Sequence, residues 1–157
     1  MPVNTAKVQG RRQLDYASLE ELLTDAERLS SAPIKALGNW SPGQIFRHLA
    51  LAFNCSIDGF KVKFPWYLCL IGKLFRKRLL SGSMPPGFNL PAEGGETLLP
   101  PPTSTEEGLA DLRAAIERLE REPNRAIHPV FGQMDKEQWN QIHCKHASMH
   151  MSFLVPM

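Results

Sequence analysis

The sequence has few cysteines and no pair of them at the spacing of a metal-binding or redox motif. Its 157 residues include only Cys55, Cys69 and Cys144. Three isolated cysteines disfavour both a disulfide-stapled secreted scaffold and a cysteine-based zinc module. A chain of this length can bury a core without disulfides. We therefore expect one domain over residues 1–157, with free thiols in a reducing cytoplasm.

A long apolar run is missing as well. The longest apolar stretch, around Pro65–Gly72, is far shorter than the roughly 20 residues that a membrane-spanning helix needs. The first residues are polar and basic and lack the apolar centre of a secretory signal. These absences predict a soluble, cytoplasmic protein with no stable membrane insertion.

The sequence also lacks a strong excess of charge of either sign. Its 18 basic and 16 acidic residues give a formal net charge of +2, which does not supply the basic footprint of a nucleic-acid-binding protein. We therefore expect no nucleic-acid partner. The charge is uneven, however, because the segment from Lys61 to Arg78 holds six basic residues and no acidic one. Such a run is usually a solvated face, and the alternative is a contact site for an acidic partner or a membrane surface.

Helical periodicity is the dominant pattern in the rest of the chain. Four segments repeat apolar residues every three to four positions and begin at residues that cap helices. They are residues 18–31, 41–58, 105–122 and 135–154. No segment alternates convincingly as a strand. The pattern predicts an all-α fold.

Two further segments lie between the second and third of these helices. Residues 66–80 are apolar and less regular, and we interpret them as a short accessory helix over one edge of the bundle. Residues 81–102 concentrate proline and glycine, so that we expect no regular element there. A long irregular crossover loop inside a compact domain is uncommon and often functional.

Three histidines share one face of the last predicted helix. At roughly 100° per residue, His143, His146 and His150 fall in the same arc as Trp139, while Lys145 falls outside it. Residues four apart on a helix have Cβ atoms about 5–6 Å apart. His146 and His150 can therefore direct one nitrogen each at a common metal ion.

His48 lies on the inward stripe of the second helix, with Ile45 and Leu49. A single inward histidine is more often a hydrogen-bonded core residue than a ligand. Several imidazoles in one apolar core are costly to bury, and a shared metal ion offsets several such costs together. We therefore interpret His48, His146 and His150 as ligands of a divalent transition metal.

The other titratable groups near this pattern have more than one interpretation. His143 is an alternative ligand by its spacing from His146, or else a residue behind the ligands, a proton donor or a packing residue. We expect His128 to be a surface or capping residue. Cys55 lies on a similar face to His48, so that it either reaches the cavity or packs as a small apolar residue. Three nitrogen ligands leave open positions, as in catalytic sites.

A family resemblance rests on three segments of the sequence. The run Trp40-Ser41-Pro42-Gly43-Gln44-Ile45 with His48 a turn later, residues 128–132, and the pair His146-x-x-x-His150 resemble the DinB/YfiT-like superfamily, in its branch of domains of unknown function. The resemblance implies a four-helix bundle with a three-histidine metal site, commonly zinc or nickel, and often a homodimer. The ligands that it implies here are His48, His146 and His150. Some relatives are thiol-dependent S-transferases or metal-dependent hydrolases.

These observations lead to one main hypothesis and two alternatives. The main hypothesis is an enzyme whose metal activates water or a low-molecular-weight thiol for transfer to a small-molecule substrate. No carboxylate lies between His146 and His150, which disfavours a protease of the His-Glu-x-x-His type. The first alternative is a non-catalytic stress or binding protein whose metal stabilises the bundle. The second is peripheral membrane association through residues 61–78.

Overall fold

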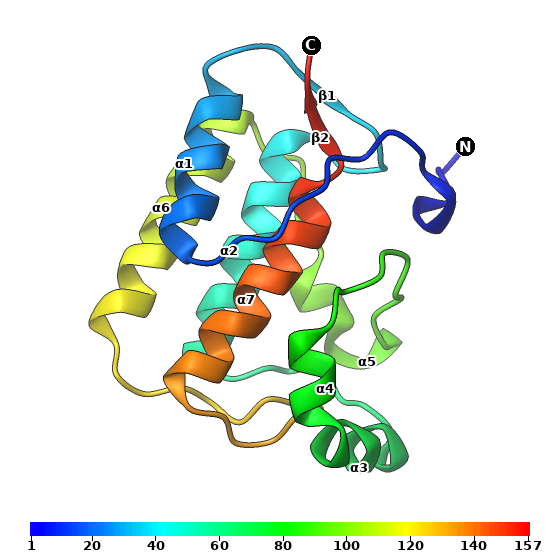
Figure 1. Ribbon diagram of the computed structural model, residues 1–157, viewed down its shortest axis with the longest axis vertical. Coiled ribbons are helices and arrows are strands. Elements are labelled where there is room, and N and C mark those ends of the chain that lie inside the picture. Colours follow the sequence, from blue (N-terminus) through cyan, green and yellow to red (C-terminus); the bar gives the residue numbers. More distant parts are fainter.

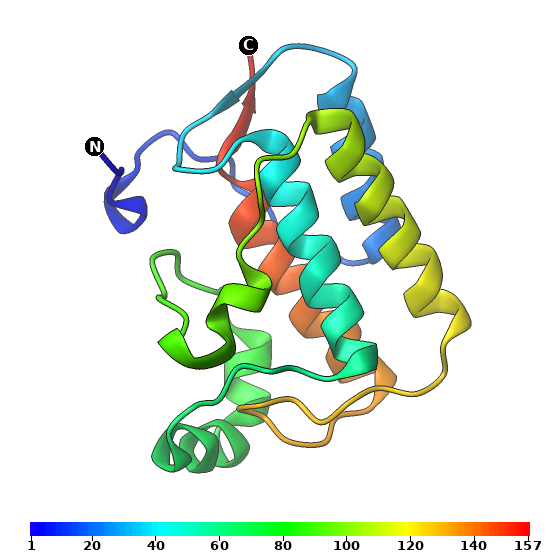
Figure 2. The same cartoon turned by 180° about the vertical axis from the view of Figure 1, so that it is seen from behind.

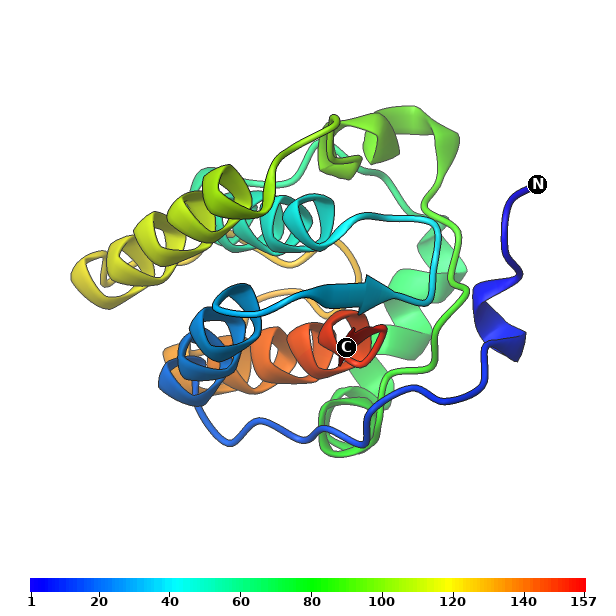
Figure 3. The same cartoon turned by 90° about the horizontal axis from the view of Figure 1, so that it is seen from above.

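Four long helices run side by side and carry most of the core (Figure 1). The computed structural model describes residues 1–157, of which 55% lie in seven α-helices and two short 3₁₀ helices. The long helices are α1 (Leu19–Ser30), α2 (Pro42–Asp58), α6 (Thr105–Arg121) and α7 (Lys136–Met151). Seen from above, α1 and α7 lie on one side and α2 and α6 on the other (Figure 3). The prediction of a mostly helical chain is confirmed.

The helices begin where the capping residues predict. Complete capping boxes start three of them, formed by Ser41 with Gln44, Ser104 with Glu107, and Asp135 with Gln138. At α1 the Ser18 hydroxyl accepts from the Glu21 amide, but the Glu21 carboxylate accepts from the amide of Ala17 instead of Ser18. The capping box at α1 is therefore only half formed. Local sequence alone sets these helix starts.

Helix α7 is buried on two faces, whereas its sequence pattern predicted one core-facing stripe. Cys144, Ala147 and Met151 pack into the main core with α1 and α2. His146 and His150 lie on a different face, where they are half-buried and line a cavity. The histidine face is therefore the wall of a cavity and not the centre of the apolar core.

A two-stranded antiparallel sheet makes the all-α prediction incomplete. Strand β1 (Ile34–Ala36) pairs with β2 (Leu154–Pro156), and Lys35 lies opposite Val155. The last helix consequently ends at Met151, before the predicted boundary at residue 154. Strands of three residues are too short to display the alternation over four to eight residues by which strands are recognised.

The accessory segment forms two short helices instead of the one predicted over residues 66–80. Helix α3 (Trp66–Leu74) and helix α4 (Arg76–Ser81) meet at a break at Phe75. On α3, Gly72 is buried against Val130. On α4, Leu80 is buried in a small cluster with Met134 and Trp139. No helix in the chain has the length and apolar character needed to cross a membrane.

The proline-rich crossover lies beside α2 and contains short elements that its composition did not predict (Figure 2). A single turn, α5 (Ala92–Gly95), leads into a 3₁₀ helix, η2 (Glu96–Leu98). Gly94 has a φ of 80° and closely approaches the backbone of Lys61, so that this turn depends on glycine. A further 3₁₀ helix, η1 (Thr5–Lys7), lies near the N-terminus.

An ion-pair network ties the N-terminal segment to α1 and to the end of α7. The Arg12 guanidinium donates to both carboxylate oxygens of Asp25, at 3.0 and 2.8 Å, and to the carbonyl oxygens of Met151 and Leu154. The Tyr16 hydroxyl also donates to Asp25. Burial alone would raise the pKa of Asp25, but the hydrogen bonds from Arg12, Tyr16 and Arg28 outweigh it and lower the pKa to about 2. The network therefore fixes the end of α7 at Met151, directly after the histidine pair.

We expect acid to weaken this network in a defined pH range. Because the pKa of Asp25 is lower in the folded chain than in the unfolded one, its contribution is complete above about pH 4 and lost as the pH falls towards 2. The loss is roughly 2 kcal/mol of unfolding free energy. Urea titrations between pH 5 and 2 measure it, and Asp25→Asn removes this part of the pH dependence. An unchanged acid profile in Asp25→Asn would contradict the assignment.

The contact between α2 and α6 depends on two glycines. A Cβ added at Gly43 would meet the backbone of Thr103 and Ser104, and one at Gly108 would meet the backbone of Gly43. We expect Gly43→Ala to lower the free energy of unfolding by about 1–3 kcal/mol, because the backbones must move apart. Gly82→Ala is the matched control, since its Cβ meets only ordinary contacts. Equal stability of the two variants in denaturant titrations would refute this explanation.

Candidate metal centre

The structure brings together the three histidines that the sequence predicted as ligands. His48 comes from the middle of α2, and His146 and His150 come from the last turns of α7. One candidate ligand atom from each lies within 4.8 Å of those of the other two. The Nε2 atoms of His48 and His146 are 3.2 Å apart. Residues separated by about 100 positions therefore form one cluster, here called the histidine triad.

The crossover loop orients one member of the triad. The Nδ1 atom of His48 lies 2.7 Å from the carbonyl oxygen of Leu98, at the end of η2. Since a carbonyl only accepts, Nδ1 carries the proton and donates, which leaves the Nε2 lone pair directed at His146. Metal-ligating histidines commonly make this second hydrogen bond, because it fixes both the tautomer and the ring angle. The long irregular loop thus has a specific part in the site.

Trp40 forms a wall behind the triad, which the sequence pattern did not indicate. Its ring stacks on that of His150, with ring centroids 5.5 Å apart and an interplanar angle of 16°. Its ring also packs against that of His48, with centroids 4.8 Å apart. A residue directly before a helix cap typically packs against the first turn, here against Ile45. The available signal was its place one residue before Ser41, the cap of the helix that carries His48.

The environment keeps the three imidazoles neutral. Burial lowers the pKa of His48 and outweighs the opposite effect of the Leu98 carbonyl. Burial also lowers the pKa of His146 and His150 well below the usual value, and the neighbouring imidazoles lower it further. No aspartate or glutamate lines the cavity next to the triad. Neutral nitrogen with a free lone pair is the form in which histidine binds a metal ion.

The spacing of the triad is compatible with one ion. In a tetrahedral site with metal–nitrogen bonds of about 2.0–2.1 Å, the nitrogens lie roughly 3.3 Å apart. The His48–His146 separation of 3.2 Å already matches this distance. Separations up to 4.8 Å within the triad need side-chain adjustments of about 1.5 Å to reach the same geometry. The donor set therefore fits a divalent transition ion.

A cavity of about 660 Å³ adjoins the triad. Its wall comes from α2, α4, α7 and the loops around residues 82–90 and 128–131, and most of its lining is apolar or aromatic. All three triad histidines belong to that wall. A site held by three protein ligands beside such a space has room for a further ligand, as catalytic metal sites require.

The remaining candidate residues lie outside the triad. His143 also lines the cavity, but it is buried and hydrogen-bonded. The Ser56 hydroxyl donates to the carbonyl oxygen of Phe53, so that it accepts from Nε2 of His143 at 3.1 Å. His128 caps a turn, because its Nδ1 accepts from the amides of Val130 and Phe131. Burial lowers the pKa of His143 to about 3 and that of His128 to about 4. Cys55 does not line the cavity.

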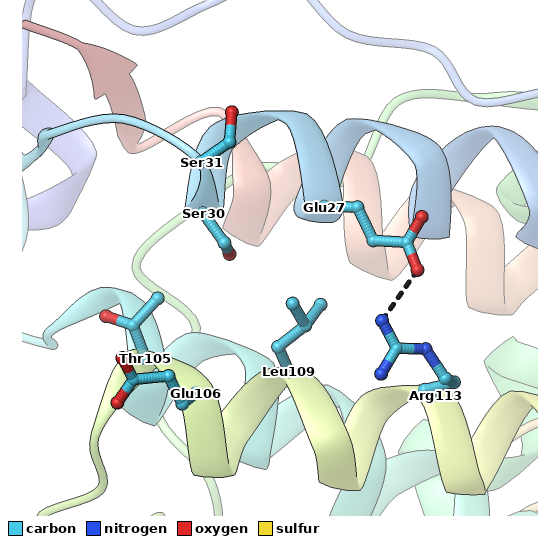
Figure 4. Close-up of a pocket in the computed structure, with 7 residues that line it drawn as sticks. All are labelled: Glu27, Ser30, Ser31, Thr105, Glu106, Leu109 and Arg113. Carbon is cyan, nitrogen blue, oxygen red and sulfur yellow. Dashed lines mark hydrogen bonds and ion pairs between the residues drawn. The ribbon is translucent and has the colours of Figure 1, made fainter.

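A second, shallower pocket lies between α1 and α6 (Figure 4). Six of its seven lining residues are polar or charged, and the ion pair between Arg113 and Glu27, at 2.7 Å, closes one end. Ser30 and Thr105 lie at the other end. It contains no histidine or cysteine, and its only basic side chain, Arg113, is already paired with Glu27. The triad is therefore the stronger candidate site.

Metal content distinguishes the triad from the neighbouring core histidine. We expect His146→Gln to lose stoichiometric divalent metal, because two imidazoles alone bind far more weakly than three. His143→Gln is the matched control on the same helix, since a glutamine amide can still donate to Ser56. Elemental analysis of both purified variants measures the difference. Retention of metal by His146→Gln, or its loss only from His143→Gln, would contradict the assignment.

Comparison with known proteins gives one family. The model of the family described as "Protein of unknown function (DUF1569)" matches residues 8–157. No curated protein and no solved structure matches the chain. The matched region contains all three members of the triad, Trp40 and the whole crossover loop. Since the match leaves out only the first seven residues, the chain belongs to the DUF1569 family.

Proposed function

We propose that the chain is a DinB-like metal-dependent enzyme in which His48, His146 and His150 hold one divalent transition-metal ion, zinc or nickel first. The observation that carries the proposal is the convergence of three neutral imidazoles on the wall of a cavity of about 660 Å³. The four long helices that share one core support the DinB-like four-helix bundle. The order of the ligands, one on α2 and a pair on α7, supports the same relationship.

Transfer of a low-molecular-weight thiol to a small electrophile is the reaction that fits this site best, and hydrolysis by water is the second. When bound, the metal ion supplies a positive charge that lowers the pKa of a thiol or of water in its open position. The cavity wall offers no carboxylate to act as a base. A thiol has a much lower pKa than water, so that it depends less on a base from the protein.

The chain's own residues bind and orient the reactants. The Leu98 carbonyl holds the ring of His48, and Trp40 packs against His48 and His150. The apolar wall, which includes Phe153, Ile142 and Met149, favours an electrophile with an apolar body and excludes water from it. The homodimer that the resemblance implies stays a prediction.

A thiol-transfer assay on metal-depleted and reloaded protein tests this function. We expect zinc or nickel to restore conjugation of a low-molecular-weight thiol to monochlorobimane. His150→Gln should lower the rate more than about 100-fold, because loss of an outer-sphere partner alone costs 10–100-fold. His143→Gln, the control, should retain activity.

Two outcomes of the same assay would contradict an enzyme. A metal ion that raises the melting temperature but supports neither thiol transfer nor ester hydrolysis would favour the structural role of the metal. Equal rates for His150→Gln and the unaltered chain would assign the reaction to another site. In either case metal content, measured beside activity, separates failure of binding from failure of catalysis.

A further inference from the structure

The segment from Lys61 to Ser81, here called the arm, presents an apolar stripe to the solvent. Trp66 and Leu74 of α3 are 76% and 71% exposed. The stripe also contains Tyr67, Leu70 and Ile71, and it continues into Phe75 and Leu79. At 100° per residue the five side chains from α3 occupy one arc of about 140°. An ordinary surface helix turns such a stripe towards the core.

The opposite face of α3 is the one attached to the protein. Gly72 is buried against Val130, where an added Cβ would collide with that residue. The Cys69 thiol donates to the carbonyl oxygen of Pro129 at 3.1 Å. Arg76, at the start of α4, donates to the carbonyl oxygen of Gln133 at 2.6 Å. These contacts hold the apolar stripe outwards, and it cannot rotate inwards without breaking them.

The charged side chains of the arm itself are all basic. No aspartate or glutamate occurs between Asp58 and Glu93. Of the basic side chains, Lys63 pairs with Glu93. Four others are exposed and form no ion pair: Lys61, Lys73, Lys77 and Arg78. An apolar stripe bordered by unpaired cations complements a surface that has anionic groups on the outside and an apolar layer beneath them.

We propose that the arm docks onto the surface of a lipid bilayer that contains anionic headgroups. The stripe enters the boundary between headgroups and acyl chains, where Trp66 and Tyr67 have the side chains favoured at that depth. The lysines and arginine reach the headgroup phosphates. A second copy of the chain is a poorer occupant of the same surface, because two arms would bring like charges together.

The arm is also continuous with the cavity. Leu79 is about half exposed and lines the cavity, and Phe88 of the following loop is exposed and lines it too. Phe64, at the start of the arm, packs against Phe88 with ring centroids 6.2 Å apart. A docked arm would therefore bring the apolar rim of the cavity close to the lipid.

Vesicle binding by the full chain tests the proposal. We expect co-sedimentation with phosphatidylcholine vesicles that contain about one-third phosphatidylglycerol, no binding to pure phosphatidylcholine, and weakening by salt. Fluorescence of the exposed Trp66 should shift to the blue on binding. The double variant Lys77→Gln/Arg78→Gln should bind about thirtyfold more weakly, at roughly fivefold per cation. Arg121→Gln/Lys136→Gln, which changes two exposed cations elsewhere, should bind normally.

A second pair of variants tests the contribution of the apolar stripe to vesicle binding. Trp66→Ser/Leu74→Ser should abolish binding, whereas Leu99→Ser/Ile127→Ser, at exposed apolar positions outside the arm, should not. All four side chains are exposed, so that the variants should fold, and circular dichroism checks this. Absence of binding by the unaltered chain, or equal loss in both pairs, overturns the proposal. A dimer in analytical ultracentrifugation that Trp66→Ser/Leu74→Ser abolishes, without vesicle binding, overturns it in favour of self-association.

Discussion

Three imidazole nitrogens face one another in a space that contains no acid. Two of them lie 3.2 Å apart, and burial keeps all three rings neutral. A single proton can be shared by only two of the three nitrogens at a time. Protonating any one ring is unfavourable, because no carboxylate lies nearby to stabilise the positive charge. A metal ion can satisfy all three lone pairs together. The chemistry of the molecule follows from this arrangement.

The rest of the fold can be understood by how it keeps the triad in place. Close contact between Gly43 and Gly108 fixes α2 against α6, and thereby the helix that carries His48. The Arg12–Asp25 pair holds the end of α7 at Met151, directly after His150. The crossover loop supplies the Leu98 carbonyl that sets the tautomer of His48. Each contact joins segments far apart in the sequence, which gives a site of defined geometry on rigid elements.

What could be predicted from the sequence was local. The capping boxes at Ser41, Ser104 and Asp135 are complete within four residues, and the chelate spacing of His146 and His150 lies within one turn. The helix starts and the closeness of these two histidines in the structure therefore agree with the sequence patterns. The approach of His48 was inferred from its inward face and from a family resemblance, and its partner at Leu98 had no sequence signal because it depends on the path of an irregular loop.

Features set by long-range packing were missed. The β1–β2 pair is too short for a periodic signal. Gly72 and Leu80, on either side of the break at Phe75, pack against different partners that are distant in the sequence. Trp40 reaches His150 only through the tertiary fold. The second buried face of α7 was overlooked because its small residues, Cys144 and Ala147, carry little apolar signal.

X-ray absorption spectroscopy of the zinc-loaded protein tests the central claim most directly. A triad of His48, His146 and His150 predicts three imidazole nitrogens at about 2.0 Å from the zinc, with the multiple scattering of imidazole rings and one further light ligand. In a sample freed of low-molecular-weight thiols, a sulfur ligand at about 2.3 Å would assign the metal to a cysteine. Such a shell, or one without imidazole scattering, would contradict a three-histidine site.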